Sequence, residues 1–239
     1  MNTIDSLTDE IALKRYVEGT LTEFVDDTIE SIIGGAFNEL YQLTKVDLPK
    51  LKNINAGIFN KCTELTEVSL SEITSLPTNM FANCTKLSSI SCPKVTSIGQ
   101  TAFDSCKSLS SLPSYFSNVT SIGNYAFRSC EKLESADFPK ITILDSGTFT
   151  ECKALANANV PLVETVKAFA FYKCSSLTRL YFPSATNIEL RSLDGCTSLT
   201  DIYVSFASDS SSATGAPWGA PNATVHYSTV FDENGEPVT

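Results

Sequence analysis

Hydrophobic residues recur along this chain with a period of about 22 residues, which is typical of an internal repeat. A phenylalanine marks the phase in seven consecutive units and a leucine takes its place in the eighth: Phe37, Phe59, Phe81, Phe103, Phe127, Phe149, Phe171 and Leu193. A leucine follows every marker after six residues. A cysteine follows after three residues in seven units: Cys62, Cys84, Cys106, Cys130, Cys152, Cys174 and Cys196. Because seven of the eight cysteines share one phase, the repeat is real.

The spacing within one unit predicts a turn followed by a short strand. Apolar positions lie three residues apart, at the marker and at the third and sixth residues after it, which suits a helical or 3₁₀ turn. The alternation of Val46 and Leu48 around Asp47 then indicates a strand. Proline, which cannot donate to a sheet, ends this strand in five units: Pro49, Pro93, Pro139, Pro161 and Pro183. A second apolar pair, such as Val95 and Ile98, precedes the next marker.

One such unit cannot fold alone, because it buries too few side chains to offset the conformational entropy of ordering its residues. Stacking buries both sides of every coil and pairs each strand with the next. The sequence therefore predicts an α/β repeat solenoid with short parallel strands, made of about eight coils of about 22 residues each and closed by caps. Parallel crossover connections are overwhelmingly right-handed, so a right-handed solenoid is expected.

The unit resembles the BspA-type bacterial leucine-rich repeat. The pattern Ile-Gly-x-x-Ala-Phe-x-x-Cys-x-x-Leu runs from Ile98 through Phe103 and Cys106 to Leu109. The resemblance extends over residues 21–205. It implies a curved leucine-rich-repeat solenoid that, in that family, often serves in protein binding and surface adhesion. It also implies a cell-surface or secreted location, although residues 1–5 lack the basic start and apolar stretch of a signal peptide.

The chain divides into three parts. Residues 1–20 are predicted to form an N-terminal cap helix, because Ser6 and Asp9 resemble a capping box ahead of an apolar-periodic segment. The solenoid follows over residues 21–205. Residues 206–239 are expected to form a C-terminal capping loop, a closing strand near Ala223–Tyr227, and a tail from Phe231 onward.

The charge is strongly negative and unevenly placed. The whole chain carries a net charge of −10, and residues 200–239 contain five acidic side chains and no basic one. This balance argues against a nucleic-acid partner, which would require a basic face. No apolar run approaches the roughly 18 residues of a membrane-spanning helix, so no membrane insertion is expected.

The cysteines are expected to form a ladder of buried thiols inside the solenoid. One or two incidental disulfides remain an alternative, although neighbouring strands hold side chains farther apart than a relaxed bridge prefers. A straight ladder cannot gather four ligands around one ion, so no metal and no cofactor are predicted. Cys92 lies outside the common phase, at an inward strand position, and is also assigned to the core.

Most exposed strand positions are small and hydroxylic, and only the C-terminal coils offer a candidate binding surface. Arg179, Tyr181 and Tyr203 have the aromatic-plus-arginine composition of binding hot spots, and Trp218 in the C-terminal loop extends the patch. The alternative is structural: the tyrosines cover a polar sheet, and Trp218 plugs the cap.

A two-residue expansion separates Phe103 from Phe127, because the interval between these two markers is longer than all the others. Insertions in repeats map to loops and sometimes to binding sites. Tyr115 and Phe116 lie in this insertion and form a second candidate contact. Inward packing of one of the two rings is the competing interpretation.

No catalytic motif is present, and the chain is predicted not to be an enzyme. Three functions are compared. The first is a binding or adhesion module for a host or extracellular protein or a glycan, and the second is a structural spacer in a larger surface or phage-like fibre assembly. The third, a carbohydrate-active enzyme, rests only on scattered carboxylates such as Glu134 and Asp137. The sequence does not specify the oligomeric state.

Overall fold

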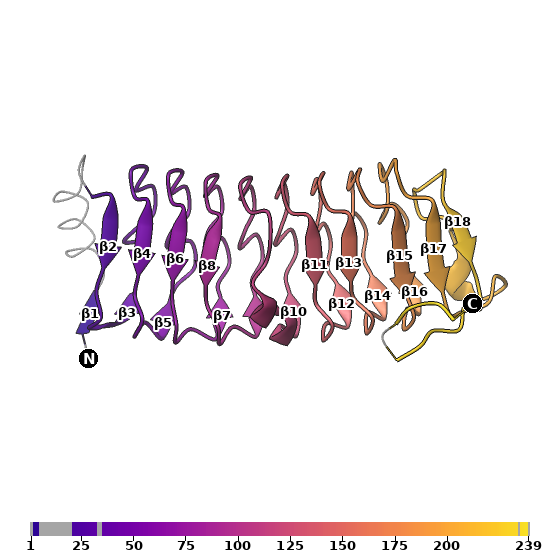
Figure 1. Cartoon of the computed structure of the whole chain (residues 1–239), viewed down its shortest axis with the longest axis horizontal. Helices are drawn as coiled ribbons and strands as arrows, with labels where there is room; N and C mark the ends of the chain where they lie inside the picture. The colour runs from indigo at the N-terminus through magenta and orange to yellow at the C-terminus, as the bar shows by residue number, and fades with distance from the viewer. Residues whose placement is uncertain (1, 5–20, 33–34, 234, 239) are drawn as a thin grey trace.

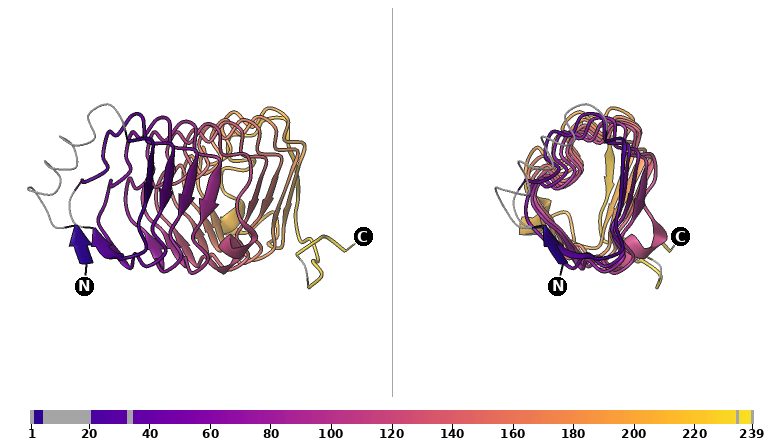
Figure 2. Two further views of the ribbon diagram at one scale, coloured as in Figure 1. Left: turned by 60° about the vertical axis from the view of Figure 1, so that its left-hand side comes forward. Right: turned by 90° about the vertical axis from the view of Figure 1, so that its left-hand side faces the viewer.

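The computed structural model describes residues 2–4, 21–32, 35–233 and 235–238, and shows an elongated stack of coils with short strands on two faces (Figures 1 and 2). The first face carries β2 (Glu23–Val25), β4 (Lys45–Asp47), β6 (Glu67–Ser69), β8 (Ser89–Ser91), β11 (Ser135–Asp137), β13 (Asn157–Asn159), β15 (Arg179–Phe182), β17 (Asp201–Val204) and β18 (Thr224–His226). The second face carries β1 (Asn2–Ile4), β3 (Ile29–Ile32), β5 (Asn53–Ile54), β7 (Ser75–Leu76), β9 (Ser97–Ile98), β10 (Ser121–Ile122), β12 (Ile143–Leu144), β14 (Thr165–Val166) and β16 (Asn187–Ile188).

The register confirms the predicted repeat. Strands one coil apart pair in parallel, so that Val46 on β4 lies beside Val68 on β6. Across the expansion, Ser97 on β9 pairs with Ser121 on β10, which places the two extra residues outside the ladder of the second face. The chain is therefore a parallel-strand solenoid of about nine turns.

The predicted helical turns are present as turn hydrogen bonds rather than as helices. In the described residues the only helical elements are the short 3₁₀ segments η1 (Ser114–Asn118) and η2 (Ser211–Ala213). Around each marker, alternate N–H groups bond within the coil or to the next one: Phe59 N donates to Met80 O at 3.1 Å, and Cys62 N to Phe59 O at 3.2 Å. This alternation satisfies the backbone of a tight bend without a helix.

The marker phenylalanines stand in one file along the axis of the solenoid. Neighbouring rings from Phe37 to Phe171 have centroids 5.2–5.6 Å apart. All of these rings are fully buried, as is Leu193 in the eighth place. A residue and its counterpart one coil later thus occupy equivalent core sites, as the period predicts.

The eight cysteines are free and buried, which confirms the predicted thiol ladder. Each of the seven cysteines in phase also makes the same type of hydrogen bond, which the sequence pattern does not reveal. Each thiol donates to the carbonyl oxygen of the marker one coil earlier, as Cys84 Sγ does to Phe59 O at 3.0 Å. That carbonyl oxygen also accepts from Cys62 N, so the thiol supplies its second donor.

Glycine precedes some markers by four residues because neighbouring coils approach closely there. A Cβ atom on Gly99 would lie 2.7 Å from Thr78 N, and one on Gly123 would lie 2.6 Å from Gln100 N. Both contacts are shorter than van der Waals distance and involve backbone that cannot move independently. The Ile-Gly pair of the repeat therefore reflects coil packing.

The expansion between Phe103 and Phe127 replaces a strand of the first face with η1. Phe116 is only 1% exposed and takes the core position that Cys92 and Phe138 fill in neighbouring coils. Tyr115 lies half-buried at the edge of β8, where its hydroxyl accepts from Cys92 N at 2.9 Å and donates to Ile90 O at 2.8 Å. The hydroxyl thus replaces the hydrogen bonds that the missing strand would make.

We expect Tyr115→Phe to destabilise the protein by about 1–2 kcal/mol, because it leaves two partly buried backbone groups without partners. The free energy of unfolding from urea denaturation measures this loss. Tyr41→Phe is the matched control, since Tyr41 is 51% exposed and its hydroxyl makes no hydrogen bond within the described chain. Equal stability of Tyr115→Phe and the wild type would contradict the assigned role.

The two ends of the solenoid differ from the predicted caps in detail. Residues Asn2–Ile4 form β1, which pairs in parallel with β3, and the rest of the predicted N-terminal cap helix lies outside the described residues. At the other end, the predicted closing strand is present as β18, which pairs with β17. The tail beyond it turns back as a hairpin, with a bridge between Phe231 and Pro237.

Candidate functional site

The exposed residues of the first face change character along the solenoid. Near the N-terminal end, Lys45 Nζ on β4 lies 3.1 Å from Glu67 Oε1 on β6. The middle coils present serines such as Ser89 and Ser91. Large aromatic side chains gather only on β15, β17 and β18, so the C-terminal third is the part of this face that differs chemically from the rest of its described strands.

Tyr181, Tyr203 and His226 form a continuous stack on these three strands. The rings of Tyr181 and Tyr203 have centroids 5.1 Å apart, and those of Tyr203 and His226 are 4.3 Å apart and nearly parallel. The stack follows from register, because Tyr181 pairs with Tyr203, and Tyr203 with His226. We call these three residues, together with Arg179 and Asp201, the aromatic face.

Polar contacts hold one edge of the aromatic face in place. His226 Nε2 lies 2.8 Å from Asp201 Oδ1, and Thr200 Oγ1 donates to Asp201 Oδ2 at 2.8 Å. The bond to His226, followed by that from Thr200, lowers the pKa of the Asp201 carboxyl below its ordinary value. Arg179 Nε is 3.9 Å from Asp201 Oδ2, and the Arg179 side chain is 62% exposed. The guanidinium is therefore anchored loosely and faces solvent.

The structure brings together some of the residues that the sequence singles out and separates others. Arg179, Tyr181 and Tyr203 lie on neighbouring strands as expected. Trp218 does not join them: it is fully buried, packs edge-on against Phe206 at 6.2 Å, and donates from Nε1 to Thr214 O at 3.2 Å. Its assignment to the binding surface is therefore wrong, and its place in the end of the core matches the alternative interpretation.

The second predicted contact, in the expansion, is also corrected. Phe116 is inside the core, and the Tyr115 hydroxyl is bonded to the edge of β8. Phe116 therefore offers no surface to a partner, and the Tyr115 ring is half-buried with its hydroxyl already bonded. Conversely, sequence analysis missed His226 as a surface residue of this face, because it follows Tyr203 one residue later than the period predicts.

A groove of about 320 Å³ borders the aromatic face. On the solenoid side its lining includes Asn157, Asn159, Arg179 and Tyr181, from β13 and β15. On the other side the tail hairpin contributes Gly235 and Glu236. The hairpin rests close to the solenoid, since a Cβ atom on Gly235 would lie 3.2 Å from Pro161 Cβ.

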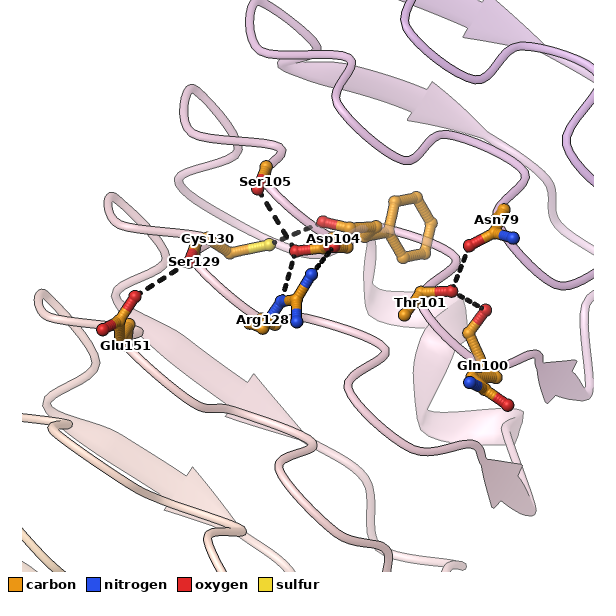
Figure 3. A network of polar contacts seen from close by, with 10 residues as sticks. Asn79, Gln100, Thr101, Asp104, Ser105, Arg128, Ser129, Cys130 and Glu151 are labelled. Atoms are coloured by element: carbon orange, nitrogen blue, oxygen red, sulfur yellow. Dashed lines mark hydrogen bonds and ion pairs between the residues drawn. The ribbon is translucent and has the colours of Figure 1, made fainter.

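A separate polar network lies on the turns of the middle coils (Figure 3). The Asp104 carboxylate is only 8% exposed and is bound by both Nε and Nη2 of Arg128, with Nε at 2.9 Å. Ser105 Oγ also donates to Asp104 Oδ1 at 3.2 Å. The network joins neighbouring coils and has a structural role, because these donors already have partners within it.

We expect Arg128→Ala to destabilise the protein by about 2–3 kcal/mol, because it leaves a buried carboxylate without its bidentate partner. Adding Asp104→Asn should recover part of this loss by removing the buried charge. Lys86→Ala breaks the half-exposed pair with Glu64 and should cost less than about 0.5 kcal/mol. Urea denaturation of the variants measures the differences, and similar losses in Arg128→Ala and Lys86→Ala would refute the assignment.

The metal ligands and paired carboxylates that the sequence was searched for do not come together in the described part of the chain. Within those residues, no three His, Cys, Asp or Glu side chains gather in a group that could hold a metal ion. Asp137, one of the scattered carboxylates, accepts from Asn159 Nδ2 at 2.7 Å. No helix among the described residues has the length and apolar character needed to cross a membrane.

A regularly repeated coil, a file of buried markers and an open strand face together define a leucine-rich-repeat solenoid. Comparison with protein families agrees, since the model for the BspA type leucine rich repeat region (6 copies) matches residues 15–133 and 96–212. The chain belongs to this family. A search of curated proteins finds no match.

Two solved bacterial proteins share this fold. A leucine-rich repeat protein from Bacteroides ovatus is 20% identical, with 88% of this chain and 70% of that chain covered, at a TM-score of 0.65. A leucine-rich repeat protein from Eubacterium ventriosum is 19% identical, with 90% and 80% covered, at a TM-score of 0.52. At this level of identity the two structures establish the fold alone.

Proposed function

We propose that this chain is a non-enzymatic module that binds a host or extracellular protein through its aromatic face. The stack of Tyr181, Tyr203 and His226 beside the exposed Arg179 is the observation that carries the proposal. Aromatic rings and arginine dominate protein-binding hot spots, since both offer large contact areas at low entropic cost. The family supports a binding role, because leucine-rich repeat proteins generally bind proteins and are generally not enzymes.

The aromatic face is organised before any partner arrives. Each ring is half-buried and stacks on at least one ring of an adjacent coil, and His226 is fixed by Asp201. A preorganised surface loses little side-chain entropy on binding, so more of the contact energy appears as affinity. The serine-rich middle of the first face lacks such anchors, which supports a partner seated on the C-terminal coils.

Binding of the labelled chain to an array of immobilised extracellular-matrix and serum proteins tests this proposal. We expect the double variant Tyr181→Ala and Tyr203→Ala to bind its captured protein at least about 100-fold more weakly, since hot-spot truncations cost about 2 kcal/mol or more each. Surface plasmon resonance with the captured protein measures the ratio.

Tyr41→Ala is the matched control, because it removes an equally large exposed ring from a turn near the N-terminal end. It should bind like the wild type. Melting temperatures of both variants verify that the fold is retained. Undiminished binding by the double variant, or equal loss in the Tyr41→Ala control, would remove the aromatic face from the proposal.

A further inference from the structure

The groove beside the aromatic face has one open aromatic surface. Tyr203 stacks on one side of Tyr181, but no aromatic ring in the described chain stacks on its other side. The equivalent position one coil earlier is Asn159, whose side chain is short and donates to Asp137 in the preceding coil. Tyr181 and Asn159 both line the groove, so part of the Tyr181 ring borders open space.

Polar groups around this ring both donate and accept. The Asn157 carboxamide makes no hydrogen bond within the described part of the chain, and Asn159 retains a free acceptor after its bond to Asp137. The exposed guanidinium of Arg179 adds further donors, and Glu236 on the tail hairpin adds an acceptor. A carboxamide presents two donors and an acceptor, which matches a ligand whose own groups play both roles.

Charge and polarity narrow the class of ligand. An anionic ligand would meet a chain of net charge −10 and the acidic tail residues Asp232, Glu233 and Glu236. A cationic ligand would face Arg179, and an apolar one would desolvate the carboxamides without returning their hydrogen bonds. The chemistry therefore favours a neutral, hydroxyl-rich ligand.

We propose that this groove binds a neutral saccharide. A pyranose ring has an apolar C–H face that packs on an aromatic ring, and vicinal hydroxyl groups that donate and accept at its rim. Tyr181 supplies the platform, while Asn157, Asn159 and Arg179 bind the hydroxyls. The volume of about 320 Å³ suits one or two sugar units. This site shares Arg179 and Tyr181 with the protein contact proposed above, but its carboxamides come from β13, outside the aromatic face.

Saturation-transfer difference NMR on the full chain tests the proposal. The probes are three neutral oligosaccharides, maltotriose, lactose and triacetylchitotriose, and one anionic oligosaccharide, sialyllactose. We expect saturation transfer to at least one neutral probe at millimolar concentration. The double variant Asn157→Ala and Asn159→Ala should weaken that binding by about tenfold or more, because it removes at least two hydrogen bonds.

Asn53→Ala on the second face is the matched control, since it removes an exposed carboxamide far along the chain from the groove. It should bind saccharides like the wild type. The groove variant keeps Tyr203 and His226, so loss of saccharide binding with retained protein capture separates the two proposals. Absence of transfer to every neutral probe, preference for sialyllactose, or unchanged affinity of the groove variant would each overturn the saccharide site.

Discussion

Raising the pH to between about 9 and 10 is expected to unfold the protein cooperatively, because eight thiols are buried and none is in a disulfide. Burial raises the pKa of Cys62, Cys92 and Cys196 to about 12, and it raises the pKa of the other five thiols as well. In the unfolded chain the same thiols ionise near their ordinary pKa of about 8.5.

The direction of the effect follows from proton counting. Below about pH 7.5, a unit under the unfolded pKa, the thiols are almost fully protonated in both states, so they add little pH dependence. Above it, the unfolded chain releases protons that the folded protein retains up to about pH 12, and stability falls as pH rises through this window. At about pH 9.5, ionisation of the unfolded chain costs the folded state on the order of 1 kcal/mol for each thiol, and on the order of 10 kcal/mol for all eight. Whole domains are stable by only about 5–15 kcal/mol.

Circular dichroism against pH, together with the ultraviolet absorbance of thiolate, measures this transition. The signals for lost structure and for thiolate should change together. The double variant Cys92→Ala and Cys196→Ala is the control, because it removes two of the eight thiols and should reduce the slope of stability against pH by about a quarter. A protein that keeps its folded circular dichroism spectrum at about pH 11 and shows no thiolate absorbance would refute this account.

Phe127→Ala is expected to destabilise the protein by about 3–5 kcal/mol. Phe127 is fully buried and stacks between Phe103 at 5.2 Å and Phe149 at 5.5 Å, with Phe138 at 5.7 Å beside it. Truncation leaves a cavity in the middle of the file. Because each coil contacts only its neighbours, the damage also weakens the interface between the two halves of the solenoid.

Urea denaturation followed by circular dichroism measures the loss, and a broadened or two-step transition would report uncoupling of the halves. Leu162→Ala is the matched control, since it removes an apolar side chain that is 50% exposed. It should change stability by less than about 0.5 kcal/mol. A cost below about 1 kcal/mol for Phe127→Ala would contradict the central place of the file in the core.

The core could be predicted in detail from the sequence because, in a solenoid, the repeat period fixes which residues become neighbours. Residues one repeat apart must lie beside each other once strands pair in register, so Phe59 and Phe81 are neighbours without any knowledge of tertiary structure. The same logic placed the cysteines inside. It did not reveal why cysteine is used there, because the bond from Cys84 Sγ to Phe59 O depends on the local path of the bend.

The candidate surface was only partly predictable, for the same reason. Tyr181 and Tyr203 share a phase, and their stacking follows from the period. His226 and Trp218 lie beyond the regular coils, where the repeat no longer fixes position. The burial of Phe116 was not predictable either, although it lies within the repeat, because the two-residue expansion does not specify which aromatic ring faces the core.

The sequence by itself determined the coil, its length, the file of phenylalanines and the burial of the thiols. The physical reason is that stacking successive coils in register buries all of the periodic apolar positions. Tertiary structure alone decided which side chains remain on the surface at irregular positions. Trp218 packs at the end of the core, the Tyr115 hydroxyl makes the hydrogen bonds of a missing strand, and His226 stacks on Tyr203. Each outcome depended on contacts between segments whose relative placement no periodic spacing specifies.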